Sequence, residues 1–186
     1  IMTRRLLASR TTTPENVDGA DWTAERSWLL LRMGEALVAR QLVQQVDSDR
    51  FSKRLHEVAM PVFLANGDLA AMCPNAETAA KETSAPTWRL AIPICASLAG
   101  EQGRATSLLN QARNRQWAKG IDLLLSEKAI GAGTNGRRAV TVKWDKVVSF
   151  NAWRHGISVA VGLEPPERLY DLMGRHMDGW RAQLPM

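Results

Sequence analysis

Apolar residues recur every three or four positions along most of this chain, the spacing of residues on one face of an α-helix. The pattern breaks at short stretches that contain Gly, Pro, Asn or Asp, which are typical of turns. The predicted helices cover residues 22–33, 35–46, 51–63, 86–98, 103–115, 117–130, 145–161 and a final segment that opens at Pro165 or Pro166 and reaches Trp180. A further helix between residues 63 and 86 contains Cys73. The chain is therefore predicted to be all-α.

Two features depart from regular helices. Pro61 and Pro93 fall inside predicted helices, where a proline removes one backbone hydrogen bond and is expected to kink the helix. Residues 139–144 alternate between apolar and polar side chains, as a short strand would, although a helical turn also fits this sequence.

Four glycines stand 33 residues apart, at Gly34, Gly67, Gly100 and Gly133, and the first three are each followed by an acidic residue. Mostly apolar residues also recur at two fixed positions before each glycine. Glycine adopts the left-handed conformation that ends many helices, and an acidic residue is favourable in the first turn of the next helix. The pattern predicts a repeated helix–turn–helix unit.

This repeat divides the chain into three parts within one domain. Residues 1–20 are interpreted as an N-terminal extension or the end of a preceding segment, residues 21–133 as a helical array with a period of about 33, and residues 134–186 as a C-terminal helical cap. Because Ile1 precedes Met2, the chain is interpreted as a processed product or a fragment of a longer protein.

The glycine-ended helix pair, with small residues such as Ala36 and Ala39 in its second helix, resembles the tetratricopeptide and Sel1-like helical repeats. The resemblance covers roughly residues 22–133, but the helix-terminal proline of the tetratricopeptide pattern has no constant position here. It implies a right-handed array of antiparallel helix pairs, a solenoid, with a concave face that binds another protein. Similar helical superhelices form the non-catalytic part of soluble lytic transglycosylases.

Composition and charge narrow the range of partners that the chain is expected to bind. The chain is 45% hydrophobic and 23% charged, which is typical of a globular protein with a packed core. No apolar stretch approaches the roughly 18 residues needed to span a bilayer. The net charge of +5 favours acidic partners, but the basic residues are spread along the chain, with tight pairs such as Arg4-Arg5 and Arg137-Arg138. Nucleic-acid binding is therefore a subordinate hypothesis.

A glycine-rich segment, residues 131–136, matches the letters G-x-G-x-x-G. A dinucleotide site needs a strand before this motif and an acidic residue about 20 positions on, whereas here a helix precedes it and Asn151 holds that position. Two interpretations remain. The loop amides with Arg137 and Arg138 could bind an anion at Gly133 and Gly136, or the segment is a flexible connection.

The remaining polar residues carry no recognisable catalytic, cofactor or metal motif. His56, His155 and His176 lie far apart without ligand spacing and are predicted to lie on helix surfaces. Asp47 and Asp49 are predicted to cap a helix rather than to bind calcium, because the sixth position of the calcium loop is Ser52. The seven tryptophans fall mostly on apolar helix faces and are predicted to pack in the core and between units.

The two cysteines are the strongest candidate site. Cys73 and Cys95 lie about equally far from the turn near residues 82–84, so antiparallel neighbouring helices would place them level. A disulfide between them would indicate an oxidising compartment, while two buried reduced thiols would fit the cytoplasm.

The function predicted from the sequence is a non-enzymatic scaffold or adaptor without cofactors, whose partner is another protein. The alternatives are a helical accessory domain of a larger cell-envelope enzyme, similar to a lytic transglycosylase, and a nucleic-acid-binding protein. The predicted location is the periplasm or cell envelope, with the cytoplasm as the alternative.

Overall fold

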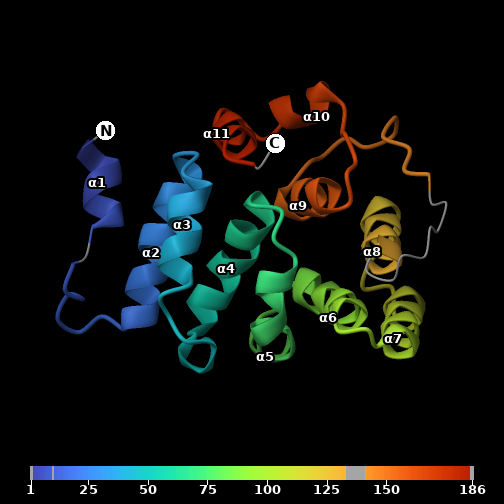
Figure 1. The fold of residues 1–186 in the computed structure, drawn as a ribbon, viewed down its shortest axis with the longest axis horizontal. Helices are drawn as coiled ribbons and strands as arrows, with labels where there is room; N and C mark the ends of the chain where they lie inside the picture. The colour runs from blue at the N-terminus through green and yellow to red at the C-terminus, as the bar shows by residue number, and fades with distance from the viewer. Residues whose placement is uncertain (1, 10, 133–140, 185–186) are drawn as a thin grey trace.

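The computed structural model describes residues 2–9, 11–132 and 141–184 of the chain. Within these residues the only regular elements are helices, so the predicted all-α fold is confirmed (Figure 1). The elements are α1 (Met2–Ala8), α2 (Gly19–Arg32), α3 (Ala36–Val43), the 3-10 helix η1 (Ser48–Arg50), α4 (Lys53–Ala65), the 3-10 helix η2 (Ala70–Asn75), α5 (Ala76–Glu82), α6 (Pro86–Leu98), α7 (Gln102–Asn114), α8 (Ile121–Ala132), α9 (Ala152–Ala160), α10 (Glu167–Asp171) and α11 (His176–Ala182). None of the described helices is both long enough and apolar enough to cross a membrane.

Three of the regularly spaced glycines end a helix in the left-handed conformation. Gly34, Gly67 and Gly100 follow α2, α4 and α6 with φ angles of 84°, 64° and 82°. At each one, the amide of the following residue donates to the carbonyl five residues back, at 2.8 to 3.0 Å. This is the Schellman arrangement, and glycine adopts it without a steric penalty. The predicted helix ends are confirmed at these positions, while Gly133 lies outside the described residues.

The internal prolines do not interrupt their helices. α4 continues through Pro61 and α6 through Pro93. The neighbours Met60, Val62 and Ile94 are all buried, so core packing holds both helices together although each lacks one backbone hydrogen bond.

α8 begins later than the sequence pattern predicts, at Ile121 rather than at Trp117. Gln116 and Gly120 both have φ angles of 57°, and these left-handed residues separate α7 from α8. Trp117 therefore lies in a turn, where its side chain is half-buried.

The C-terminal region also contains shorter helices than predicted. Residues 145–151 are not helical, and α9 begins where the Asn151 side chain accepts a 3.0 Å hydrogen bond from the amide of Arg154. Gly174, with a φ angle of 90°, lies between α10 and α11, which replace the single predicted helix. In the predicted strand or turn, residues 141–144 are irregular, and residues 139–140 lie outside the described residues.

The extension before α2 contains a helix attached to the first unit. Arg26 of α2, which is 7% exposed, donates hydrogen bonds to the carbonyls of Leu7 and Ser9 at the end of α1. Arg4 of α1 forms a 2.9 Å ion pair with Glu35 in the turn after α2. These contacts hold α1 against α2 and α3.

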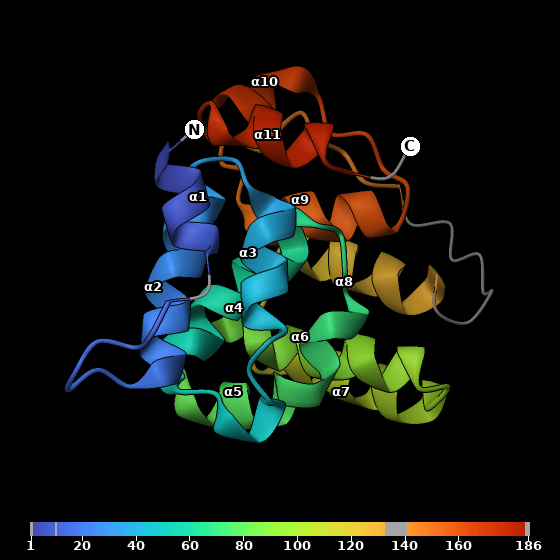
Figure 2. The ribbon, with the colours of Figure 1, turned by 60° about the vertical axis from the view of Figure 1, so that its left-hand side comes forward.

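The last helix returns to the first unit, as Figures 1 and 2 show from two directions. α11 packs so closely on the turn after α2 that a methyl group on Gly179 would lie 2.6 Å from the Gly34 carbonyl oxygen. Trp180 Nε1 donates to the Leu31 carbonyl at 2.9 Å, and Gln183 Nε2 donates to the Gly34 carbonyl at 2.6 Å. These bonds satisfy acceptors that the end of a helix leaves available.

α9 contacts the second unit in a similar way. A methyl group on Gly156 would lie 2.6 Å from the Leu64 carbonyl oxygen, and one on Gly67 would lie 2.6 Å from Val159 Cγ1. α9 also packs against α8, whereas α4 and α6 lack the close backbone packing that joins α2 to α4. α9 therefore connects α4 directly to α8, while α11 covers the turn after α2.

Candidate functional site

The two cysteines are joined. Cys73 in η2 and Cys95 in α6 form a disulfide with a Cα–Cα distance of 5.4 Å. Cys73 lies in a 3-10 helix rather than in the predicted α-helix. Both residues are half-buried at the surface, and the bond ties the segment before α5 to α6.

The prediction that the histidines lie on helix surfaces is wrong for two of them. His56 is 1% exposed and His155 is 0% exposed, while His176 is half-buried. Both buried histidines are on helix faces that long-range packing covers, and a local sequence pattern does not report such packing.

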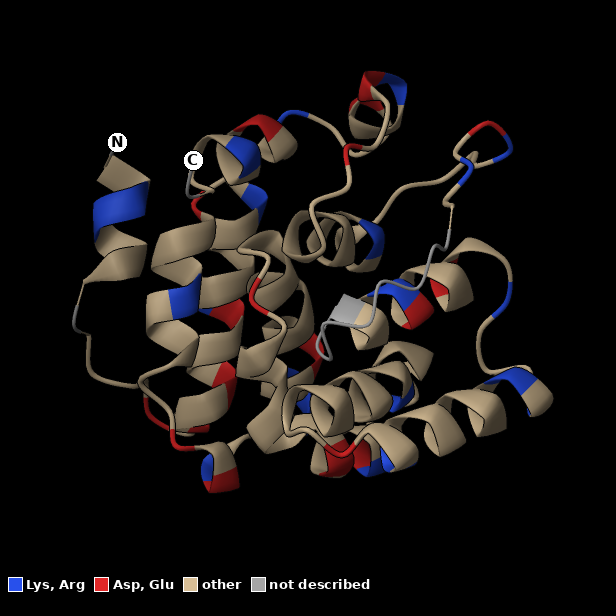
Figure 3. Cartoon of the chain, turned by 45° about the vertical axis from the view of Figure 1, so that its right-hand side comes forward, with Lys and Arg blue, Asp and Glu red and all other residues tan. Residues whose placement is uncertain are grey.

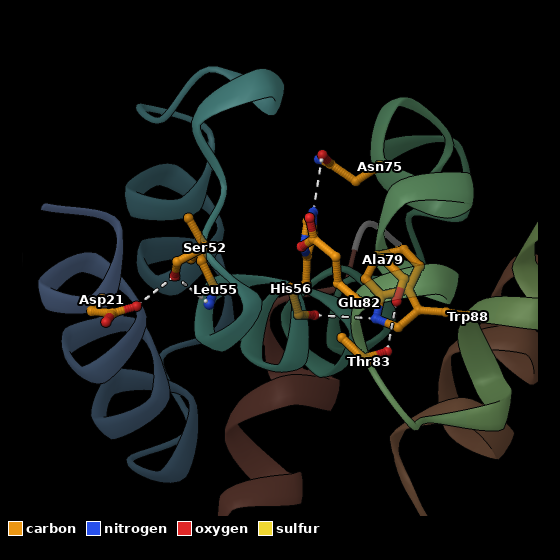
Figure 4. Close-up of polar contacts among 9 residues, drawn as sticks. All are labelled: Asp21, Ser52, Leu55, His56, Asn75, Ala79, Glu82, Thr83 and Trp88. Atoms are coloured by element: carbon orange, nitrogen blue, oxygen red, sulfur yellow. Dashed lines mark hydrogen bonds and ion pairs between the residues drawn. The ribbon is translucent and has the colours of Figure 1, made fainter. Parts of the chain in front are cut away.

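His56 is the buried member of a polar cluster that joins α4, η2, α5 and α6 and in which Glu82 is exposed (Figure 4). Its Nδ1 lies 2.9 Å from a Glu82 carboxylate oxygen, and its Nε2 lies 3.4 Å from the Asn75 side-chain oxygen. The His56 carbonyl accepts a 3.2 Å hydrogen bond from Trp88 Nε1. Both ring nitrogens therefore have partners within the protein, and the ring itself is buried. The cluster positions the helices.

A serine and an aspartate lie close to this cluster but do not form a catalytic triad with it. The Ser52 hydroxyl donates to Asp21 Oδ1 at 2.5 Å and accepts a 3.1 Å hydrogen bond from the Leu55 amide. Figure 4 shows these bonds on the side of α4 that faces α2. A nucleophilic serine would instead bond to a histidine ring nitrogen. Ser52 is the N-cap of α4, and its bond to Asp21 connects α4 to α2.

The anion-binding loop predicted from the sequence stays a prediction. Gly133, Gly136, Arg137 and Arg138, which would form the anion-binding loop, all lie outside the described residues. Within residues 2–9, 11–132 and 141–184, no group of three or more His, Cys, Asp or Glu side chains could hold a metal ion.

A candidate for binding among the described residues is a groove between α5, α6 and α7, with a volume of about 300 Å³. Its residues are Glu77, Ala80, Lys81, Arg89, Ile92, Arg104, Leu108, Gln111 and Trp117. The apolar members are half-buried and the charged members are exposed. The groove therefore has an apolar floor and a polar rim.

Two further hollows adjoin this groove. One of about 330 Å³ contains the disulfide and shares Glu77, Ile92 and Arg104 with the groove. Another of about 320 Å³ shares Trp117 with it and includes Lys119. Trp117 thus lies between two hollows, and the first groove continues toward the disulfide.

Two arginines lie over the ring of Trp117, and of these Arg89 lines the groove whereas Arg115 lies beside it. The guanidinium carbons of Arg89 and Arg115 lie 5.1 Å and 5.3 Å from the Trp117 ring centroid. Among the described residues neither arginine has a carboxylate partner, whereas Arg104 pairs with two glutamates at 2.7 Å and 2.8 Å. Sequence reasoning missed this arrangement because it predicted Trp117 to lie on a helix, and because only Arg115 is its neighbour in sequence.

Comparison of the chain with protein-family models, with curated proteins and with solved structures finds no match.

Proposed function

We propose that this chain is a non-enzymatic adaptor that binds another protein in the groove between α5, α6 and α7. The observation that carries the proposal is the half-buried apolar floor of Ala80, Ile92, Leu108 and Trp117 beneath a rim of exposed charged side chains. Protein-binding surfaces have this anatomy, with an apolar centre that excludes water and a polar rim. Trp117 is the central anchor.

The fold proposed for this adaptor is a right-handed tetratricopeptide-like array of helix pairs. The regular left-handed glycines after α2, α4 and α6 support it, as do the closely packed pairs α2–α3 and α6–α7. The disulfide supports an oxidising location such as the periplasm or cell envelope, where such bonds persist.

Site-specific photo-crosslinking in the source cells tests the proposal. A photoreactive amino acid replaces Gln111, which lines the groove, or Asn110, its exposed neighbour on α7 that does not. We expect a discrete protein adduct from position 111 that disappears when Trp117→Ala is added, and no such adduct from position 110. Adducts of equal yield at both positions, or an adduct that Trp117→Ala leaves unchanged, would show that the groove does not bind a partner.

A further inference from the structure

The geometry points to an acidic peptide segment as the occupant of this groove. Carboxylates of the segment bind Arg89 and Arg115, and an apolar side chain between them packs on Ile92 and Leu108. This inference rests on the proposed function and adds the chemistry of the partner.

Positive side chains in and beside the groove favour an acidic partner. Arg89 and Arg115 both contact Trp117, so two positive groups are held near one ring with no carboxylate partner among the described residues. Lys81 and Lys119 add two exposed positive charges to the same hollows, and neither forms an ion pair within the described part of the chain. A partner that supplies carboxylates would form charge-assisted hydrogen bonds with these side chains.

Stacking also prepares the arginines for a carboxylate. A guanidinium group held against an indole face keeps its N–H donors around its edge, in the plane that a carboxylate needs for two parallel hydrogen bonds. The Trp117 ring that holds them is itself half-buried. Less side-chain freedom is then lost when the partner binds.

The charges on the α5 and α7 side of the groove favour a peptide over a nucleic acid as the bound partner. Glu77 lines the groove there and pairs with Arg104, so a continuous row of phosphates would meet a carboxylate within the same groove. Figure 3 shows Lys and Arg interspersed with Asp and Glu over the helices, rather than gathered in one basic stripe. A peptide can place its acids beside Arg89 and Arg115 and an apolar residue on the floor. A nucleic-acid backbone carries a phosphate at every nucleotide and does not alternate acidic groups with apolar ones.

Fluorescence anisotropy with a labelled peptide in which aspartates alternate with leucines tests the inference. Two other probes of similar length are compared with it, namely the same peptide with lysines in place of the aspartates, and an oligothymidylate. We expect binding of the acidic peptide alone. Arg89→Gln and Arg115→Gln should each weaken it about tenfold, as the loss of a charge-assisted hydrogen bond does.

Arg32→Gln is the matched control, because Arg32 also stacks on a tryptophan, Trp28, at 5.8 Å and lies outside the groove. This variant should bind the peptide as the unmodified protein does. The inference is overturned if the acidic peptide does not bind, if the Arg89/Arg115 double variant binds it equally well, or if oligothymidylate binds as tightly. An adduct from position 111 together with any of these results would leave the adaptor proposal standing and remove only the acidic partner.

Discussion

Acidification should destabilise this fold through one buried histidine. His155 of α9 lies between the rings of Tyr170 and Trp180, with centroid distances of 6.0 Å and 5.8 Å. Burial first, and then the positive charge of Arg181, lower the pKa of His155 from 6.5 to about 4, while the nearby Ala65 backbone acts to raise it. Neither ring nitrogen makes a hydrogen bond of good geometry, so the folded protein keeps this ring neutral.

The size of the effect follows from the two pKa values. Above pH 6.5 His155 is neutral in both states and contributes nothing to the pH dependence. Below it the unfolded chain binds the proton while the folded protein does not, so the free energy of unfolding falls as the pH falls. One pKa unit corresponds to about 1.4 kcal/mol, which gives a loss of about 2 kcal/mol at pH 5 and about 3 kcal/mol at pH 4.

Urea unfolding followed by circular dichroism from neutral pH downward measures this loss. His155→Gln removes the titrating group and keeps a polar side chain. Its free energy of unfolding is subtracted from that of the unmodified protein at each pH. This difference cancels the contributions of the other titrating groups, among them His176, whose pKa is also lowered by burial. We expect the difference to change by about 2 kcal/mol between pH 7 and pH 5. Parallel pH curves for the two proteins would refute the argument.

Two further predictions concern stability. Gly156→Ala should reduce the free energy of unfolding by more than about 2 kcal/mol, because its methyl group meets the Leu64 backbone, whereas Gly103→Ala in the open part of α7 should be neutral or stabilising by up to about 1 kcal/mol. Equal effects in urea unfolding would contradict this close packing. Replacing both Cys73 and Cys95 by Ser should cost about 3 kcal/mol, because the bond closes a loop with a sequence separation of 22. A loss below about 1 kcal/mol in the same assay would show that the crosslink hardly restrains the unfolded chain.

The features that the sequence predicts well are those with local causes. A glycine that ends a helix acts through its own backbone, so Gly34, Gly67 and Gly100 could be recognised from spacing and neighbours alone. The alignment of Cys73 with Cys95 depends on one turn between adjacent helices, so it too could be predicted from the sequence.

The features that escaped prediction depend on residues far apart in the chain. The burial of His155 requires Trp180 of α11, and α11 is held by the contact of Gly179 with Gly34. The groove was missed for a similar reason, since Arg89 reaches Trp117 only after α6 and the turn before α8 have been placed. The spacing of hydrophobic residues along the chain does not encode these long-range contacts.

The return of α11 to the first unit has a consequence for how the chain is made. The bond from Trp180 to the Leu31 carbonyl joins residues 149 positions apart. Contacts of such long separation slow folding, since the intervening chain must be ordered first. A ribosome adding roughly 5–20 residues per second needs on the order of 10 s to produce that interval. A nascent chain therefore carries the turn at Gly34 uncovered until α11 has been synthesised, whereas the first repeat of a purely linear array finds its packing partner in the next repeat to emerge.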